Sequence, residues 1–234
     1  MARSARARTS PSASRSSPKA VAGQTLQALA YDLIKERLVS ARYVPGQFLQ
    51  ESTICEELKL GRTPVHQALH QLQQEGLLEI IPRKGIFIKV ESLSEIFTAL
   101  EVRALIEPYC ASQCAERATL ADIAELKEIL NEFEKLRGKS DSIRLMELDR
   151  RFHTTIARVA GNKLIVEVLR PIHERMSRLW FMPHWQFSDY DLTSTEHHQL
   201  LKAFEKRDSG AAAEAMKGHI ESLRKRILAT GSTL

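Results

Sequence analysis

The chain has 234 residues, of which 43% are hydrophobic and 27% are charged, as is ordinary for a globular protein. This length suits two domains better than one. No apolar run approaches the ~18 residues that a membrane helix needs, so a membrane-spanning protein is not expected. The formal net charge is +5. Five basic residues and no acid lie within residues 1–19, so the rest of the chain is close to neutral.

Residues 1–20 consist mostly of Arg, Ser, Ala and Pro, which cannot build a core, so we predict a disordered basic tail. Such a tail either adds sequence-independent attraction to phosphates or serves as a solubilising leader. It lacks the apolar stretch of a secretory signal, and the three cysteines show no disulfide framework. A cytoplasmic protein is therefore expected.

Residues 21–90 have the pattern of a winged helix-turn-helix. Thr63 is expected to be the N-cap of the third helix, with Pro64 at its first position, where a missing N–H costs nothing. After Gly76 the period changes to that of short strands around a turn at residues 82–85. The predicted elements are helices over 26–38, 52–58 and 63–76 and strands over 77–81 and 86–90.

The third helix is expected to enter the major groove, as the second helix of a helix-turn-helix does. Its apolar residues Val65, Leu69 and Leu72 share one face, so the opposite face is free to meet DNA. The predicted contacts are Arg62, Thr63, His66 and Gln67 on the helix and Arg83 and Lys84 at the wing tip. The alternative is an ordinary solvated surface, because residues 20–89 carry eight Lys/Arg against seven Asp/Glu.

Residues 93–230 show only helical periodicity. Ser92 or Ser94 is expected to cap the first helix, and Pro108 to split or kink it. Breaks near 119, 138, 161, 183–191 and 208–210 predict about six or seven helices. The expected fold is mainly α, with an N-terminal winged helix-turn-helix and a C-terminal all-α helical bundle.

Two stretches carry a resemblance to a known family. Residues 49–51, Gly61-Arg62-Thr63-Pro64-Val65-His66-Gln67-Ala68-Leu69 and Arg83-Lys84-Gly85 resemble the DNA-binding domain of the GntR family, and the likeness covers residues 25–90. Family members usually carry Arg at His66 and often at Ser52, which are contact positions. The departure implies weaker or pH-sensitive binding, since histidine is mostly neutral at pH 7.

Residues 93–228 resemble the helical FCD ligand-binding domain of the FadR-type subgroup, which implies a metal site. Asp149 and His153 are four apart on a largely apolar helix face. His197 and His219 also share faces with apolar residues. One carboxylate and three imidazoles suit a divalent ion, Zn²⁺ or Ni²⁺. The alternative is that each is an ordinary core residue.

The same resemblance implies a site for a small organic acid beside the metal. Arg103 would hold the effector carboxylate, since a bidentate guanidinium is a natural clamp for it. Glu101, in the same stretch, and Asn162 are assigned with it. The alternatives are an inter-helix salt bridge for Arg103 and a helix cap for Asn162.

The expected function is that of a homodimeric transcription regulator, not an enzyme, that binds double-stranded DNA at a palindromic operator. A carboxylate effector would control operator affinity, most commonly by relieving repression. A regulator that responds to the metal alone remains an alternative, and so does a metal-dependent hydrolase.

Overall fold

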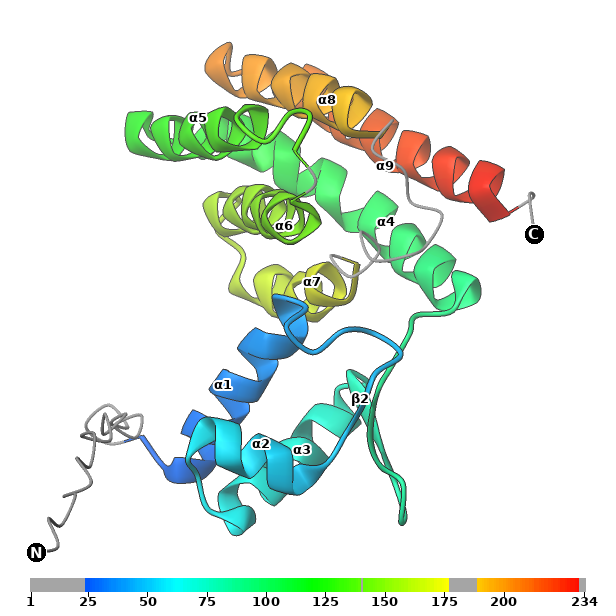
Figure 1. Cartoon of the computed structure of the whole chain (residues 1–234). Helices are drawn as coiled ribbons and strands as arrows, with labels where there is room; N and C mark the ends of the chain where they lie inside the picture. Colours follow the sequence, from blue (N-terminus) through cyan, green and yellow to red (C-terminus); the bar gives the residue numbers. More distant parts are fainter. Residues whose placement is uncertain (1–23, 140, 177–188, 232–234) are drawn as a thin grey trace, which may run out of the picture.

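The computed structural model describes residues 24–139, 141–176 and 189–231. They form a small N-terminal domain, at the bottom of Figure 1, and a larger helical domain above it. Each domain encloses a hydrophobic core of its own. The predicted fold, a winged helix-turn-helix followed by an all-α bundle, is confirmed. The predicted disordered tail lies outside the described residues.

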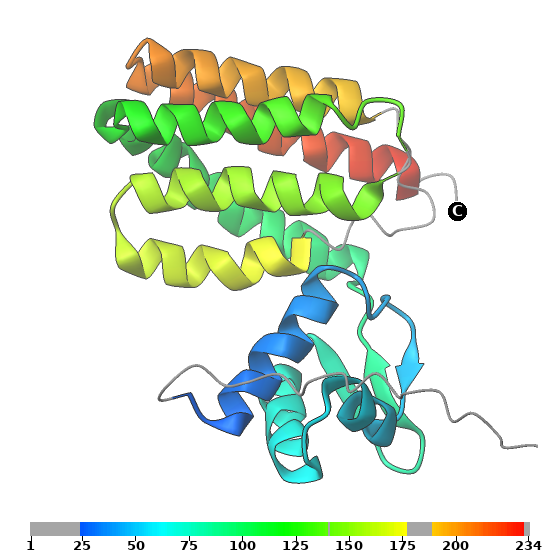
Figure 2. The same cartoon turned by 60° about the vertical axis from the view of Figure 1, so that its left-hand side comes forward.

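Three helices build the N-terminal core: α1 (Leu26–Val39), α2 (Glu51–Leu58) and α3 (Arg62–Gln74). Thr25 caps α1, and its hydroxyl accepts a hydrogen bond from a backbone N–H of the first turn. Lys59 ends α2 in the left-handed conformation. The tight turn that follows sets α3 against α1, as Figure 2 shows.

The start of α3 differs from the prediction. Thr63 is not the N-cap, because the helix begins at Arg62 and Gly61 occupies the cap position. Pro64 is therefore the third helical residue. It is tolerated there because none of the first N–H groups of a helix has an intrahelical partner.

The wing is a three-stranded antiparallel sheet of β1 (Phe48–Leu49), β3 (Gly85–Ile88) and β2 (Leu78–Ile81), in that order. The hairpin of β2 and β3 was expected, whereas β1 was not. Gly85 has φ +108, and a Cβ there would lie 2.5 Å from the carbonyl oxygen of Leu49. The glycine thus lets the two backbones approach closely.

The described part of the helical domain has six helices: α4 (Leu93–Arg117), α5 (Leu120–Glu134), α6 (Ser142–Val159), α7 (Lys163–Met176), α8 (Asp189–Glu205) and α9 (Ser209–Gly231). The count agrees with the prediction. Pro108 does not split α4, which runs unbroken through it because core residues on both sides hold the helix. Within the described residues no helix is long and apolar enough to cross a membrane.

Ser92, and not Ser94, caps α4. Its hydroxyl accepts a hydrogen bond from the Glu95 N–H (3.2 Å), and the Glu95 carboxylate accepts one from the Ser92 N–H (2.9 Å). This capping box satisfies two N–H groups that the helix itself leaves without partners.

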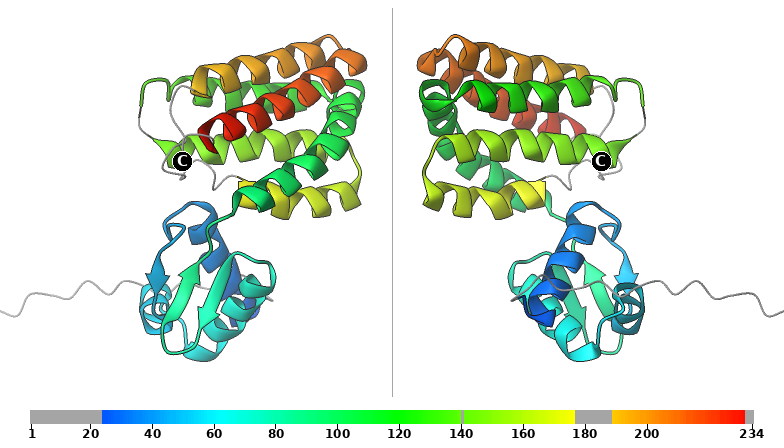
Figure 3. Two further views of the ribbon diagram at one scale, coloured as in Figure 1. Left: turned by 90° about the vertical axis from the view of Figure 1, so that its right-hand side faces the viewer. Right: turned by 90° about the vertical axis from the view of Figure 1, so that its left-hand side faces the viewer.

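The helical domain places α7 next to the DNA-binding half. Helices α4 and α9 pack along each other, and α6 lies between α5 and α7. Figure 3 shows α7 as the helix of the bundle nearest to α1. The two domains therefore meet where α1 ends.

Candidate metal centre and nucleic-acid interface

Three histidines meet in the core of the helical domain. His153 on α6, His197 on α8 and His219 on α9 are at most 3% exposed. One ring nitrogen of each lies within 4.8 Å of those of the other two. The sequence-predicted metal ligands are thus brought together from three helices, because each occupies an inward position of its helix.

The residues present suit a divalent metal ion. Both ring nitrogens of His197 are buried and have no hydrogen-bond partner among the described residues. A buried polar atom is costly without a partner, and an ion would supply one. Asp149, the fourth predicted ligand, places Oδ1 3.6 Å from Nε2 of His197. One carboxylate and three imidazoles form a donor set that Zn²⁺ and similar ions accept.

Carboxylates behind the imidazoles orient them. Glu196 Oε2 lies 2.8 Å from Nδ1 of His219, and Glu107 Oε2 lies 2.8 Å from Nδ1 of His153. When each Nδ1–H donates to its carboxylate, each Nε2 keeps a free lone pair. Such carboxylate–histidine pairs are the usual support of metal-binding imidazoles.

Burial favours the neutral form of His153 and of His197, which is the form that metal binding requires. It lowers the pKa of His153 to about 4, against the opposing charge of Glu107. It also holds the pKa of His197 well below its ordinary value, and the neighbouring His219 and His153 act in the same direction.

Glu107 is a deeply buried carboxylate in this region, and no role was predicted for it. It accepts hydrogen bonds from Arg103 Nε (2.5 Å) and His173 Nε2 (2.9 Å), in addition to the one from His153. Burial opposes its ionisation, but Arg103, His153 and His173 hold the pKa of the carboxyl well below its usual range. A sequence signal for His173 does exist, since it shares a helix face with Leu169 and Met176.

Arg103 lies beside the histidine cluster. Its Nη2 is 3.4 Å from both ring nitrogens of His153. The guanidinium is 3% exposed and pairs with Glu107, one turn along the same helix. A salt bridge, the alternative given for Arg103, is therefore present, but within one helix and not between two. The guanidinium also places a cation next to the predicted metal ligands.

Glu101 and Asn162 are not brought to this cluster. Glu101 is exposed on α4. Asn162 caps α7, accepting a hydrogen bond from the Leu164 N–H (3.1 Å). The turn before Asn162 contacts Arg117, which is fourteen residues from Arg103 on α4, or about 21 Å along the helix. We therefore leave both residues out of the candidate site.

The predicted DNA contacts lie on one exposed side of the N-terminal domain. On α3 the apolar residues Val65, Leu69 and Leu72 are buried, and the opposite face is exposed. Helix α3 and the wing occupy the end of the molecule that points away from the helical bundle. All the predicted contacts are exposed: Arg62, Thr63, His66 and Gln67 on α3 and Arg83 and Lys84 at the wing tip. His70 on α3, which was not among them, is exposed as well.

Glu51, at the start of α2, binds two of these residues. Its carboxylate accepts a hydrogen bond from Arg62 Nε (2.9 Å) and lies 3.0 Å from Nδ1 of His66. Burial opposes ionisation of Glu51, but hydrogen bonds from His66 and Arg62 hold the pKa of its carboxyl below the usual value. His66 Nε2 in turn lies 3.2 Å from Nε2 of His70.

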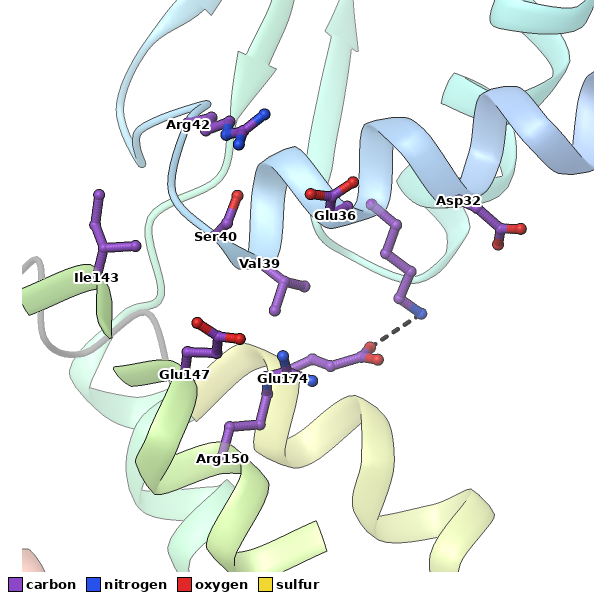
Figure 4. A pocket seen from close by; sticks show the side chains of 10 residues that line it. Asp32, Glu36, Val39, Ser40, Arg42, Ile143, Glu147, Arg150 and Glu174 are labelled. Atoms are coloured by element: carbon purple, nitrogen blue, oxygen red, sulfur yellow. Dashed lines mark ion pairs between the residues drawn. The ribbon is translucent and has the colours of Figure 1, made fainter. Parts of the chain in front are cut away.

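A cavity of about 480 Å³ lies between the domains, bounded by α1 on one side and by α6 and α7 on the other (Figure 4). At its edge Lys35 Nζ pairs with Glu174 of α7 (2.9 Å) and with Glu75 (3.0 Å). Glu174 follows His173 directly in the sequence. Helix α7 therefore directs His173 toward the histidine cluster and Glu174 toward α1.

Comparisons with known proteins agree with both halves of the fold. Residues 26–88 match the family of bacterial regulatory proteins named gntR, and residues 98–222 match the FCD domain. The Nta operon transcriptional regulator of Aminobacter aminovorans is 28% identical over 190 residues, covering 81% of this chain and 89% of that protein. The Uxu operon transcriptional regulator of Escherichia coli is 29% identical, covering 84% of each.

A solved structure, E. coli McbR/YncC, superposes with a TM-score of 0.77 at 19% identity, covering 88% of this chain and 98% of that one. At that identity the likeness shows the fold alone. The matched family and the named relatives are transcriptional regulators and not enzymes. The chain belongs to the GntR family of transcriptional regulators, in the group that carries a C-terminal FCD domain.

Proposed function

We propose that the protein is a homodimeric repressor whose affinity for a palindromic operator is controlled by a small carboxylate bound beside a divalent metal ion. The observation that carries this proposal is the buried cluster of His153, His197 and His219, with the Arg103 cation at its side. The name of one relative, the galactonate operon transcriptional repressor of E. coli, supports the sign of the regulation.

Asp149 and the three histidines would hold the ion, for which Zn²⁺ or Ni²⁺ suits the donors. When bound, the ion supplies a Lewis-acidic centre that accepts a carboxylate oxygen. Glu196 and Glu107 keep the Nδ1 protons of His219 and His153 in place, which leaves Nε2 of each ring for the ion.

Arg103 indicates the chemical class of the effector. A guanidinium beside a metal ion selects a small organic acid, because both groups attract a carboxylate. Arg103 is already paired with Glu107, so an incoming carboxylate would share or displace that partner. Such an exchange would change what Glu107 offers to His173 on α7, the helix that contacts α1.

The DNA-binding half of the proposal rests on α3 and the wing. Arg62, Thr63, His66 and Gln67 would face base edges and phosphates in the major groove, and Arg83 and Lys84 the flanking backbone. Two copies related by a two-fold axis would read the two halves of a palindrome.

Native mass spectrometry of gently purified full-length chain tests the proposal. We expect a dimer that retains one divalent ion per chain after dialysis against metal-free buffer, together with a small acid where one is carried through. The His197→Ala variant should lose the ion. The matched control is His198→Ala, because this neighbouring side chain is exposed and lies outside the cluster. A metal-free wild-type chain would overturn the metal centre and leave the DNA-binding half standing.

A regulator that responds to the metal alone is the second candidate, favoured by the pairing that already occupies Arg103. The Arg103→Lys variant distinguishes the two candidate functions. It keeps the positive charge that Glu107 needs but loses the two parallel N–H donors that bind a carboxylate. Both proteins are tested with the metal site filled. If an added carboxylate changes the DNA affinity of the wild type but not that of the variant, the result supports control by a carboxylate effector. A response to metal that is equal in both proteins supports the second candidate.

A further inference from the structure

A pair of histidines stands on the DNA-reading face of α3. His66 and His70 are four residues apart and both exposed, and the side chain of His66 is 52% exposed. Their ring centroids are 4.6 Å apart, and their Nε2 atoms face each other at 3.2 Å. Residues at this spacing lie one above the other on a helix.

The separation of the two nitrogen atoms matches chelation. Two nitrogen ligands at 2.0–2.1 Å from a tetrahedral ion lie about 3.3 Å from each other. Without an ion, the two rings can be joined only by a hydrogen bond in which one Nε2–H donates to the other Nε2. Because both side chains are exposed, small rotations let the two lone pairs converge on one point.

Glu51 prepares His66 for this role. Its Oε2 lies 3.0 Å from Nδ1 of His66, so the Nδ1–H donates to the carboxylate and the proton is kept away from Nε2. The same arrangement supports the imidazoles of His153 and His219 in the buried cluster. A carboxylate behind a histidine fixes its tautomer and raises its basicity toward a metal.

We propose that His66 and His70 chelate a divalent transition-metal ion, such as Zn²⁺, on the DNA-reading face, at a site separate from the buried cluster of His153, His197 and His219. With two protein ligands and water in the remaining positions, this ion is held more weakly than a buried one. On the proposed function, in which this face binds DNA, the bound ion occupies the Nε2 atoms that DNA would otherwise meet, so metal and DNA compete.

Equilibrium dialysis of the full-length chain at a series of buffered free Zn²⁺ concentrations tests the site without any DNA. We expect the wild type to bind a second, weaker equivalent of Zn²⁺ that His70→Gln lacks, with the tight equivalent unchanged. Glu51→Gln should weaken the second equivalent by about tenfold, as loss of a supporting carboxylate does. The matched control, Gln74→Ala, changes the next exposed position on the same helix face and should keep both equivalents.

The competition is tested with a duplex that the wild-type chain has selected from a random library. Once the tight, buried site is filled in both proteins, further Zn²⁺ should lower the affinity of the wild type for this duplex several-fold and leave that of His70→Gln unchanged. Equal Zn²⁺ binding by the wild type and His70→Gln overturns the proposal, and so does Zn²⁺ that binds the pair without changing DNA affinity. If the chain selects no duplex, only the proposed function is contradicted, because the dialysis still decides whether His66 and His70 bind the ion.

Discussion

At the scale of single residues, Glu107 organises the candidate metal centre. This one carboxylate is 2% exposed and contacts Arg103, His153 and His173, which come from three different helices. Arg103 and Glu107 compensate each other's charge where water cannot. Removing the negative charge would leave a buried guanidinium without its counter-ion.

We therefore expect Glu107→Gln to lower the free energy of unfolding of the metal-free chain by about 3–5 kcal/mol, as breaking a buried ion pair does. Urea titrations measure this. The control is Glu101→Gln, an exposed position on the same helix, which should stay within about 0.5 kcal/mol of the wild type. Equal losses in the two variants would show that the charge of Glu107 is not needed for stability.

The part of this site that could be predicted rests on the resemblance to the FCD domain, which implies the metal site, and on helix periodicity, which sets its residues inward. Asp149, His153, His197 and His219 each share a face with apolar residues, and buried faces of packed helices meet. The partners Glu107 and Glu196 depend on how neighbouring helices are rotated, which spacing along one helix does not encode. Glu101 is a different case: it is only two residues from Arg103, and residues at that spacing do not share a helix face, so helix geometry alone sets it on the outside of α4.

His66 supports a second residue-scale prediction, since the family usually carries arginine there. His66→Arg should tighten DNA binding and steepen its dependence on salt, because one further cation would neutralise a phosphate. The slope of log affinity against log salt should become more negative by about one. Fluorescence anisotropy with one duplex at several salt concentrations measures it. An unchanged slope would mean that this side chain does not reach the DNA backbone.

At the scale of elements, the sequence predicted every long helix and missed the shortest strand. Helices of fourteen residues or more repeat their apolar period several times, so their existence and rough ends are readable. Strand β1 has two residues and no period, and it exists only because β3 offers it a free edge. The first turn of α3 was misplaced by a residue or two, because Gly61 and Thr63 are both acceptable caps.

The capping box of α4 gives a prediction about pH. The hydrogen bond from Lys89, with those from Ser92, lowers the pKa of Glu95 to about 2. The unfolded value is about 4.3. A carboxyl whose folded pKa is depressed stabilises the protein above the unfolded pKa and loses this contribution as pH falls through the folded one.

Glu95→Gln should therefore be less stable than the wild type by about 1 kcal/mol at neutral pH, a value that allows for solvent screening of a partly exposed group. The difference should narrow between about pH 5 and pH 2. Urea titrations at several pH values measure it. Glu101→Gln removes a carboxylate with no hydrogen-bond partner among the described residues and serves as the control. A difference that is constant with pH would contradict the role given to the ionised carboxylate.

At the scale of the whole molecule, α7 is the link between the two domains. His173 contacts Glu107, which contacts His153, whereas the next residue, Glu174, contacts Lys35 of α1. A change at the histidine cluster therefore has a short route to the DNA-binding half, through two adjacent residues of one helix. The cavity beside this contact leaves room for α1 and α7 to shift against each other.

Lys35 is the residue of the DNA-binding half whose loss would test this link. It lies between Glu174 and Glu75, and its side chain is 14% exposed. Lys35→Met should weaken the contact between the domains by about 1–3 kcal/mol, the cost of removing the hydrogen bond that Lys35 donates to the Glu174 carboxylate. Trypsin should then cleave several-fold faster after Lys89, in the segment between β3 and α4. The control is Lys84→Met at the exposed wing tip. Equal cleavage rates in the two variants would mean that the domains are held together by something other than this ion pair.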